Sequence, residues 1–221
     1  MLTSMKKLII LVFVFISFQL NAQNYIGGRV GVNLANVSIN SDGFNFSPDR
    51  IFGINAAFFA EFGIGNNIAI QPELSFLQKG WRLKFEFFGS LADNSVKLNY
   101  IDVPILFKYK FGPPNAVNGY AILGPSFGYA FSGTVKDHVA DTSESIEFSD
   151  DDGFKRTELG AVIGVGMGFP AGTGNFIFDL RYNLGITNLS DDPSVEDDTA
   201  YNRGINISVG YRAPLGGVSE E

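Results

Sequence analysis

Residues 160–169 have the sequence GAVIGVGMGF. Gly160, Gly164, Gly166 and Gly168 stand at even positions, and larger apolar residues fill the odd positions between them. An alternation with a period of two residues is the pattern of a β-strand, whose successive side chains point to opposite faces. The segment therefore predicts a strand with one crowded face of small residues and one continuous apolar face.

The same alternation recurs along the chain. It is clear in INAAFFAEF (54–62), NIAIQPELSFLQKGW (67–81) and NFIFDLRYNLGI (175–186), and it covers approximately 25–37, 97–111, 119–131, 155–169 and 203–212. Charged residues fall on the face that carries the glycines, whereas a soluble barrel would place charge outside and large apolar residues inside. A polar inner face with an apolar outer face is typical of transmembrane barrels. We therefore expect an all-β fold, an eight-stranded antiparallel up-and-down transmembrane β-barrel.

Composition excludes several classes of function. The 221 residues carry a net charge of -7, with no surplus of cations for binding nucleic acid. There is no cysteine and a single histidine, which rules out disulfide scaffolds, thiol nucleophiles and multi-histidine metal sites. No cofactor is expected.

The N-terminus has the pattern of an export signal. Lys6 and Lys7 precede an apolar run from Leu8 to Phe18, and the small Ala22 follows just before Gln23. The run is about half of the roughly 20 residues that a spanning helix needs. We predict a signal peptide over 1–22 and a barrel domain over 23–221, with strands within about 25–212 and a short C-terminal extension over 213–221.

The lengths of the connections between strands predict the orientation of the barrel in the membrane. Long segments near 38–50, 82–96, 132–154 and 188–201 alternate with short turns at 63–67, 112–118 and 170–174. Outer-membrane barrels have short periplasmic turns and long external loops, so both mature termini are expected in the periplasm. Aromatic girdles are expected at both membrane interfaces. The candidates are Trp81, Tyr100 and Phe131 near the long loops, and Tyr25, Phe62, Tyr109, Phe111, Phe169 and Tyr211 near the short turns.

Several segments together resemble one family. QPELSFLQKGW (71–81), LNYIDVPILFKYKF (98–111), YAILGPSFGYAF (120–131), GAVIGVGMGF (160–169), DLRYNLGITNL (179–189) and ISVGYR (207–212) are similar, in this order, to the PorT-like outer-membrane β-barrels of Bacteroidota. The resemblance implies an eight-stranded barrel without catalytic residues common to the family. It also implies an alternative function as an accessory component of a protein secretion system.

Charged residues on the inward face predict an ion network in the lumen. Its members are Arg29, Glu61, Glu73, Asp102, Lys108, Asp179 and Arg181. Buried charges need partners, which favours a structural network over acid-base chemistry by paired carboxylates such as Glu73 and Asp102. An eight-stranded barrel encloses just enough space for its own side chains, so a porin-like diffusion pore is not expected. A narrow small-solute channel remains the alternative.

Two other patterns give weaker hypotheses. The glycines of 164–168 lack the GxGxxG spacing of a nucleotide site, and relief of crowding in a narrow lumen explains them better. His138 is the one available imidazole base, and Ser132, Ser143 and Ser145 are the conceivable nucleophiles near it. No orienting spacing supports that enzyme hypothesis.

Acidic residues concentrate in two of the expected external loops. Residues 132–153 hold seven carboxylates and 188–200 hold five. Weak calcium binding is one interpretation, with Asp150, Asp151, Asp152, Asp197 and Asp198 as candidates, and a solvated anionic surface is the other.

From these patterns we expect a non-enzymatic outer-membrane barrel that acts as a structural or interaction component through its external loops. The expected partners are outer-membrane lipid and lipopolysaccharide, with periplasmic or secretion-complex proteins under the alternative, and no nucleic acid. The barrel is expected to be monomeric.

Overall fold

The structure is a computed structural model that describes residues 24–41, 44–87, 90–113, 116–146, 155–189 and 199–215. The predicted signal peptide and the five aspartates proposed for calcium lie outside the described residues. Within the described ranges, no helix is long and apolar enough to cross a membrane.

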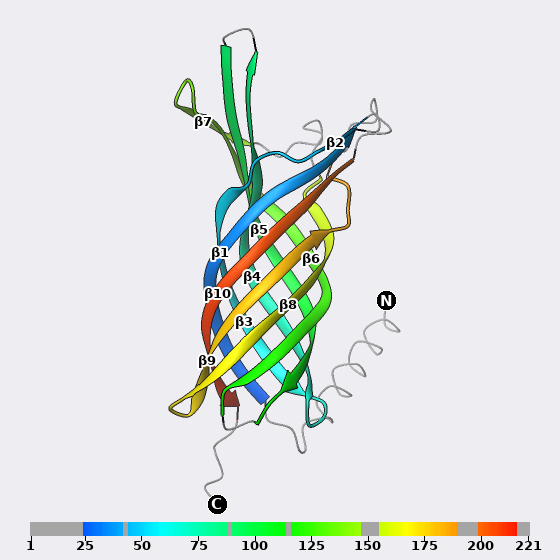
Figure 1. Cartoon of the computed structure of the whole chain (residues 1–221), viewed down its shortest axis with the longest axis vertical. Helices are drawn as coiled ribbons and strands as arrows, with labels where there is room; N and C mark the ends of the chain where they lie inside the picture. Colours follow the sequence, from blue (N-terminus) through cyan, green and yellow to red (C-terminus); the bar gives the residue numbers. More distant parts are fainter. Residues whose placement is uncertain are drawn as a thin grey trace, which may run out of the picture.

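Eight long strands form a closed ring, which confirms the predicted fold (Figure 1). They are β1 (Asn24–Ser41), β3 (Ile51–Gly63), β4 (Ile68–Phe87), β5 (Ser90–Phe111), β6 (Asn118–Asp137), β8 (Thr157–Ala171), β9 (Gly174–Gly185) and β10 (Thr199–Leu215). Each strand pairs antiparallel with its neighbours along the chain, and β1 pairs with β10 from Asn24↔Leu215 to Asn40↔Thr199. This last pairing closes the barrel, so the ring has no free edge.

The alternation in the sequence places polar groups inside and apolar groups outside. In β3 every second residue from Ile51 to Gly63 is buried, and the residues between them from Phe52 to Phe58 face outward. Phe58 is 77% exposed, and large apolar side chains are exposed in the same way on all eight barrel strands. A wall of this composition requires hydrocarbon as its solvent.

The barrel strands extend further than expected at one end. The segment 82–96, expected as a loop, continues the β4–β5 pairing to Phe87↔Ser90, and this hairpin projects beyond the ring (Figure 1). Segment 132–154, also expected as a loop, contains the end of β6 and the short strand β7 (Thr142–Ile146) paired with it. The short strand β2 (Phe44–Phe46) pairs with the end of β1.

We call this end of the barrel the long-loop end, and the opposite end, with the turns at 63–67 and 171–174, the short-turn end. Both the start of β1 and the end of β10 lie at the short-turn end (Figure 1). The last strand also runs beyond its expected limit, because 213–215 still pair with 24–26.

Three of the expected girdle aromatics face inward instead. Tyr25 and Tyr100 are buried, and the partly buried Trp81 packs against the cluster that contains Tyr100. The reason is the alternation itself. Tyr100 shares the parity of the buried Asp102, and Trp81 that of Lys79, so their side chains continue the inner face.

Candidate functional site

Among the residues that the structure describes, eleven charged side chains lie on the inner face of the barrel, in three layers along its axis. The short-turn layer consists of Glu61, Lys108, Lys110 and Arg212; the central layer of Arg29, Glu73, Asp179 and Arg181; and the long-loop layer of Lys79, Asp102 and Glu158. Apart from Lys110, all of them are buried. Because an unpaired buried charge is costly, each of these side chains is expected to lie against a charge of opposite sign.

In the short-turn layer, three cations surround one carboxylate. Lys108 Nζ lies 2.8 Å and Arg212 Nη1 2.7 Å from Glu61 Oε2, and Lys110 Nζ lies 3.1 Å from Glu61 Oε1. Lys108 also lies over the Tyr120 ring at 3.8 Å. The formal charge of this layer is +2, from three cations and one anion.

In the central layer, two arginines share the carboxylate of Glu73. Arg29 Nη2 donates to Glu73 Oε2 at 2.8 Å, and Arg181 Nη1 lies 3.0 and 2.9 Å from the two oxygens. Arg181 Nη2 also donates to Asp179 Oδ2 at 3.1 Å, and the hydroxyl of Tyr120 donates to Asp179 Oδ1 at 2.8 Å. Two cations and two carboxylates make this layer neutral.

Gln71 joins the short-turn and central layers. Its Oε1 accepts a hydrogen bond from Lys108 Nζ at 3.0 Å, and its Nε2 donates to Glu73 Oε1 at 2.6 Å. The two layers therefore form one connected polar network, in which removal of one member takes a partner from several others.

In the long-loop layer, one lysine serves two carboxylates. Lys79 Nζ lies 3.0 Å from Glu158 Oε1 and 4.0 Å from Asp102 Oδ1, and it lies over the Tyr100 ring at 4.4 Å. The amide of Asn202 donates a further hydrogen bond to Glu158. The formal charge of this layer is -1.

An apolar cluster lies beyond the long-loop layer. Leu98, Tyr100 and Ala130 form it, and Trp81, Val96 and Ile146 pack against it. Side chains thus occupy the inner face from the short-turn layer to the base of the projecting hairpin. Eight strands enclose space for little more than these side chains.

The seven residues proposed for the lumen are all buried and each takes part in an ion pair. The structure divides them among the three layers rather than joining them in one cluster. The proposed acid-base pair is separated in this way, since Glu73 pairs with two arginines and Asp102 lies beside Lys79. Sequence reasoning missed four members, namely Lys79, Lys110, Glu158 and Arg212.

The signal for the missed residues was present in the alternation. Glu158 has the parity of the inward Gly160, Arg212 that of Ser208, and Lys79 that of Glu73. All four residues lie within the expected strands, so applying the parity to every charged residue of those strands would have included them.

His138 has a different neighbour from those proposed. Its Nε2 lies 2.9 Å from Ser95 Oγ, while Ser132 Oγ accepts a hydrogen bond from Asn99 at 2.8 Å. Ser143 and Ser145 lie on β7. The backbone N–H of His138 donates to the carbonyl of Asp93 at 2.8 Å, so this residue ties the β6–β7 turn to the projecting hairpin.

Within the described ranges, no group of three or more His, Cys, Asp or Glu residues has the geometry to hold a metal ion. The lumen carboxylates each lie against a lysine or an arginine.

Comparison with solved structures gives barrels of low sequence identity. The attachment invasion locus protein Ail of Yersinia pestis is 20% identical, with 86% of this chain and 99% of that chain covered and a TM-score of 0.44. Neisserial surface protein A is 13% identical, with 88% and 100% covered and a TM-score of 0.44. The toluene transporter TodX of Pseudomonas putida is 9% identical, with 89% and 90% covered and a TM-score of 0.27. No curated protein matches the sequence.

A family model gives the assignment. The model described as outer membrane protein beta-barrel domain matches residues 21–191, which is more than half of the chain. This match agrees with the closed ring, the apolar outer wall and the charged lumen. The chain therefore belongs to the outer membrane protein β-barrel domain family.

Proposed function

We propose that this barrel is a non-enzymatic interaction component of the outer membrane that presents a β-sheet beyond the membrane at its long-loop end. The sheet, called the projecting sheet below, consists of β4 and β5 from 81 to 96, the end of β6 from 132, and β7. In this proposal the long-loop end faces the exterior and both described termini face the periplasm. One barrel acts alone, with lipid around its wall and lipopolysaccharide around the projecting sheet.

The observation that carries the proposal is the β4–β5 hairpin. Its pairing continues without a break from Gly80↔Lys97 to Phe87↔Ser90, well beyond the ring (Figure 1). Near its tip, Phe85 is 57% and Leu91 47% exposed. Apolar side chains at the end of an ordered sheet, outside the membrane band, are costly in water and are typical of an interaction surface.

The base of the projecting sheet is anchored to the barrel. Trp81 and Val96 pack against the apolar cluster of Leu98, Tyr100 and Ala130. Arg82 donates two hydrogen bonds of 2.6 Å to the carboxylate of Asp93 on the neighbouring strand. This order favours a rigid binding surface over a flexible loop, because less conformational entropy is lost on binding.

A packed lumen supports interaction rather than transport. The three charged layers and the apolar cluster fill the inner face, and moving a solute through would require breaking buried ion pairs.

The test uses photo-cross-linking in whole cells, with a photoreactive residue in place of Phe85. We expect a discrete adduct, reduced several-fold by added purified wild-type protein and not by a Phe85→Ser, Leu91→Ser variant. Lys84→Ser, which changes an exposed charged residue directly beside Phe85 on the same hairpin, is the matched control and should compete like wild type. The proposal is overturned if no adduct forms, or if the double variant competes as well as the control.

A further inference from the structure

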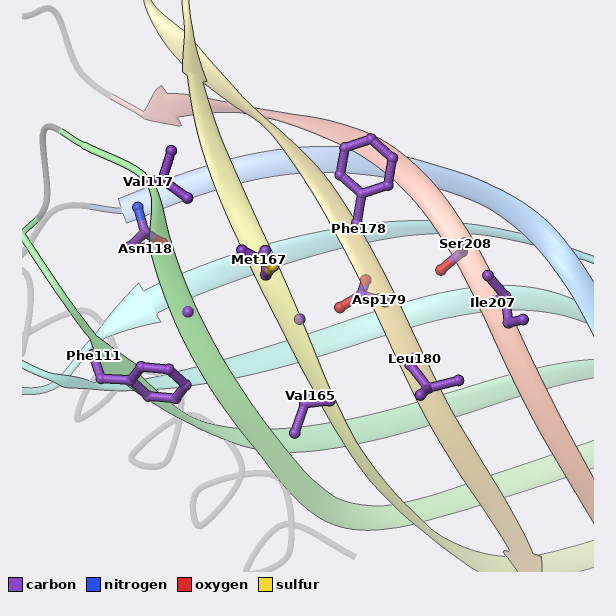
Figure 2. A pocket seen from close by; sticks show the side chains of 12 residues that line it. Phe111, Val117, Asn118, Val165, Met167, Phe178, Asp179, Leu180, Ile207 and Ser208 are labelled. Atoms are coloured by element: carbon purple, nitrogen blue, oxygen red, sulfur yellow. The ribbon is translucent and has the colours of Figure 1, made fainter.

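Two apolar grooves lie on the outer wall near the short-turn end. The first, of about 540 Å³, is walled by Phe111, Val165, Met167, Phe178, Leu180 and Ile207 (Figure 2). The second, of about 400 Å³, lies over Gly28 and Ala56 between Phe58, Phe176, Phe178 and Tyr211. Phe178 belongs to both grooves, so its ring is the wall that they share.

The grooves exist because small residues interrupt a wall of large ones. At Gly28 an added Cβ would meet its nearest atoms at 3.6 and 3.8 Å, which is ordinary van der Waals contact, so a side chain can be added here without a clash at Cβ. The flanking side chains stand out from the wall, with Phe58, Phe176 and Phe178 all exposed. The result is a pair of hollows on a surface that only hydrocarbon can solvate.

Charge at the same end of the barrel complements an anionic headgroup. The short-turn layer has a formal charge of +2. Its cations Lys110 and Arg212 point into the lumen, whereas their neighbours in sequence, Phe111 and Tyr211, line the first and the second groove on the outer face at the same end. The side chain of Lys110 is 20% exposed. In a wall of low dielectric constant, this excess charge attracts a phosphate at the nearby interface.

We propose that the two grooves form a binding site for one phospholipid of the leaflet at the short-turn end. Its two acyl chains lie on either side of Phe178, and its phosphate lies at the short-turn interface, where the positive charge of the short-turn layer attracts it. The leaflet is the periplasmic one in the orientation proposed above. The occupant is a two-chain lipid because there are two grooves with a common wall, and its phosphate matches the excess of cations.

The experiment is native mass spectrometry of the whole barrel after reconstitution with dioleoylphosphatidylglycerol and transfer to mild detergent. We expect one retained lipid per wild-type barrel, and several-fold less retention of the single-chain lysophosphatidylglycerol. Gly28→Leu fills the second groove without a close contact at Cβ, and should reduce retention of the two-chain lipid at least fivefold. Phe178→Ala, which removes the shared wall, should do the same.

The matched control is Ala161→Leu, the same kind of enlargement on the outward face of β8 but at a residue that lines neither groove. It should retain lipid like wild type. A heat-modifiable gel band shows that each variant has folded. Equal retention in Gly28→Leu and wild type overturns the proposal, as does a broad distribution of lipid numbers. A dimer that Gly28→Leu abolishes would also overturn it, because a second copy of the chain would then fill the grooves.

Discussion

Replacement of Arg181 by methionine tests the ion network most directly. Arg181 donates to both oxygens of Glu73 and to Asp179, and it is buried with them. Methionine keeps an unbranched side chain of similar reach but removes the charge and the donors. The central layer then changes from neutral to a formal charge of -1.

The loss of unfolding free energy depends on the partners that Glu73 and Asp179 keep in the variant. Glu73 keeps Arg29 at 2.8 Å and the amide of Gln71, whereas Asp179 loses its ion pair and keeps the hydrogen bond from the hydroxyl of Tyr120. Removing one partner of a buried pair costs about 3–5 kcal/mol. Because Glu73 is still paired, we expect the lower end of this range, about 3 kcal/mol.

The assay is reversible unfolding by guanidinium chloride in micelles, followed by tryptophan fluorescence and by the heat-modifiable gel band. With a slope of about 3 kcal/mol per molar, the midpoint should fall by about 1 M. The double variant Arg181→Met, Asp179→Asn removes the stranded charge as well, and should recover part of the loss. An unchanged midpoint in Arg181→Met, or no recovery in the double variant, would refute the structural role of the network.

Individual contacts give three further predictions. A Cβ at Gly166 would clash with the Tyr120 ring, so Gly166→Ala should cost about 1–3 kcal/mol of unfolding free energy. Gly65→Ala, where a Cβ meets no atom within 4 Å, should be nearly neutral in the same denaturant titration. In the hairpin beyond the ring, hydrogen bonds from Arg82 lower the pKa of Asp93. The contribution of this pair to the stability of the hairpin is therefore fully present above the ordinary carboxyl pKa of about 3.9. It is lost as the pH falls through the lowered pKa. Amide chemical shifts of the hairpin should therefore change in acid in wild type and not in Asp93→Asn; identical profiles would contradict this. Finally, the purified barrel should give no stepwise ionic conductance in planar bilayers, and regular current steps would favour the channel alternative.

The strands and the facing of their residues could be predicted from the sequence because both depend on the period-two alternation. In β8, Gly164 and Gly166 face the lumen, where added side chains would meet Arg181 and Tyr120, while Leu159 and Ile163 face outward. A closed wall allows no other arrangement, since a slip of one residue would place every charge in the lipid. The inner location of Glu73 and Arg181 follows from the same pattern.

The strand ends and the partners could not be predicted in this way. Residues 82–96 were expected as a loop because long connections are usual at one end of such barrels, yet cross-strand contacts such as Arg82 with Asp93 continue the pairing. The choice of partners depends on register across the ring. Arg29 and Glu73 lie on β1 and β4, which are not neighbours, and no pattern within one strand gives that contact.

The packed lumen also separates the two surfaces to which we assign binding. The projecting sheet extends beyond the ring at the long-loop end (Figure 1). The grooves over Gly28 and beside Phe178 are lined by residues toward the short-turn end of the strands. Sites that share no contacts usually contribute additively. Loss of lipid from the grooves should therefore leave binding by the projecting sheet unchanged. Gly28→Leu should compete for the Phe85 adduct as well as wild type does, and weaker competition would show that the two surfaces are coupled through the barrel.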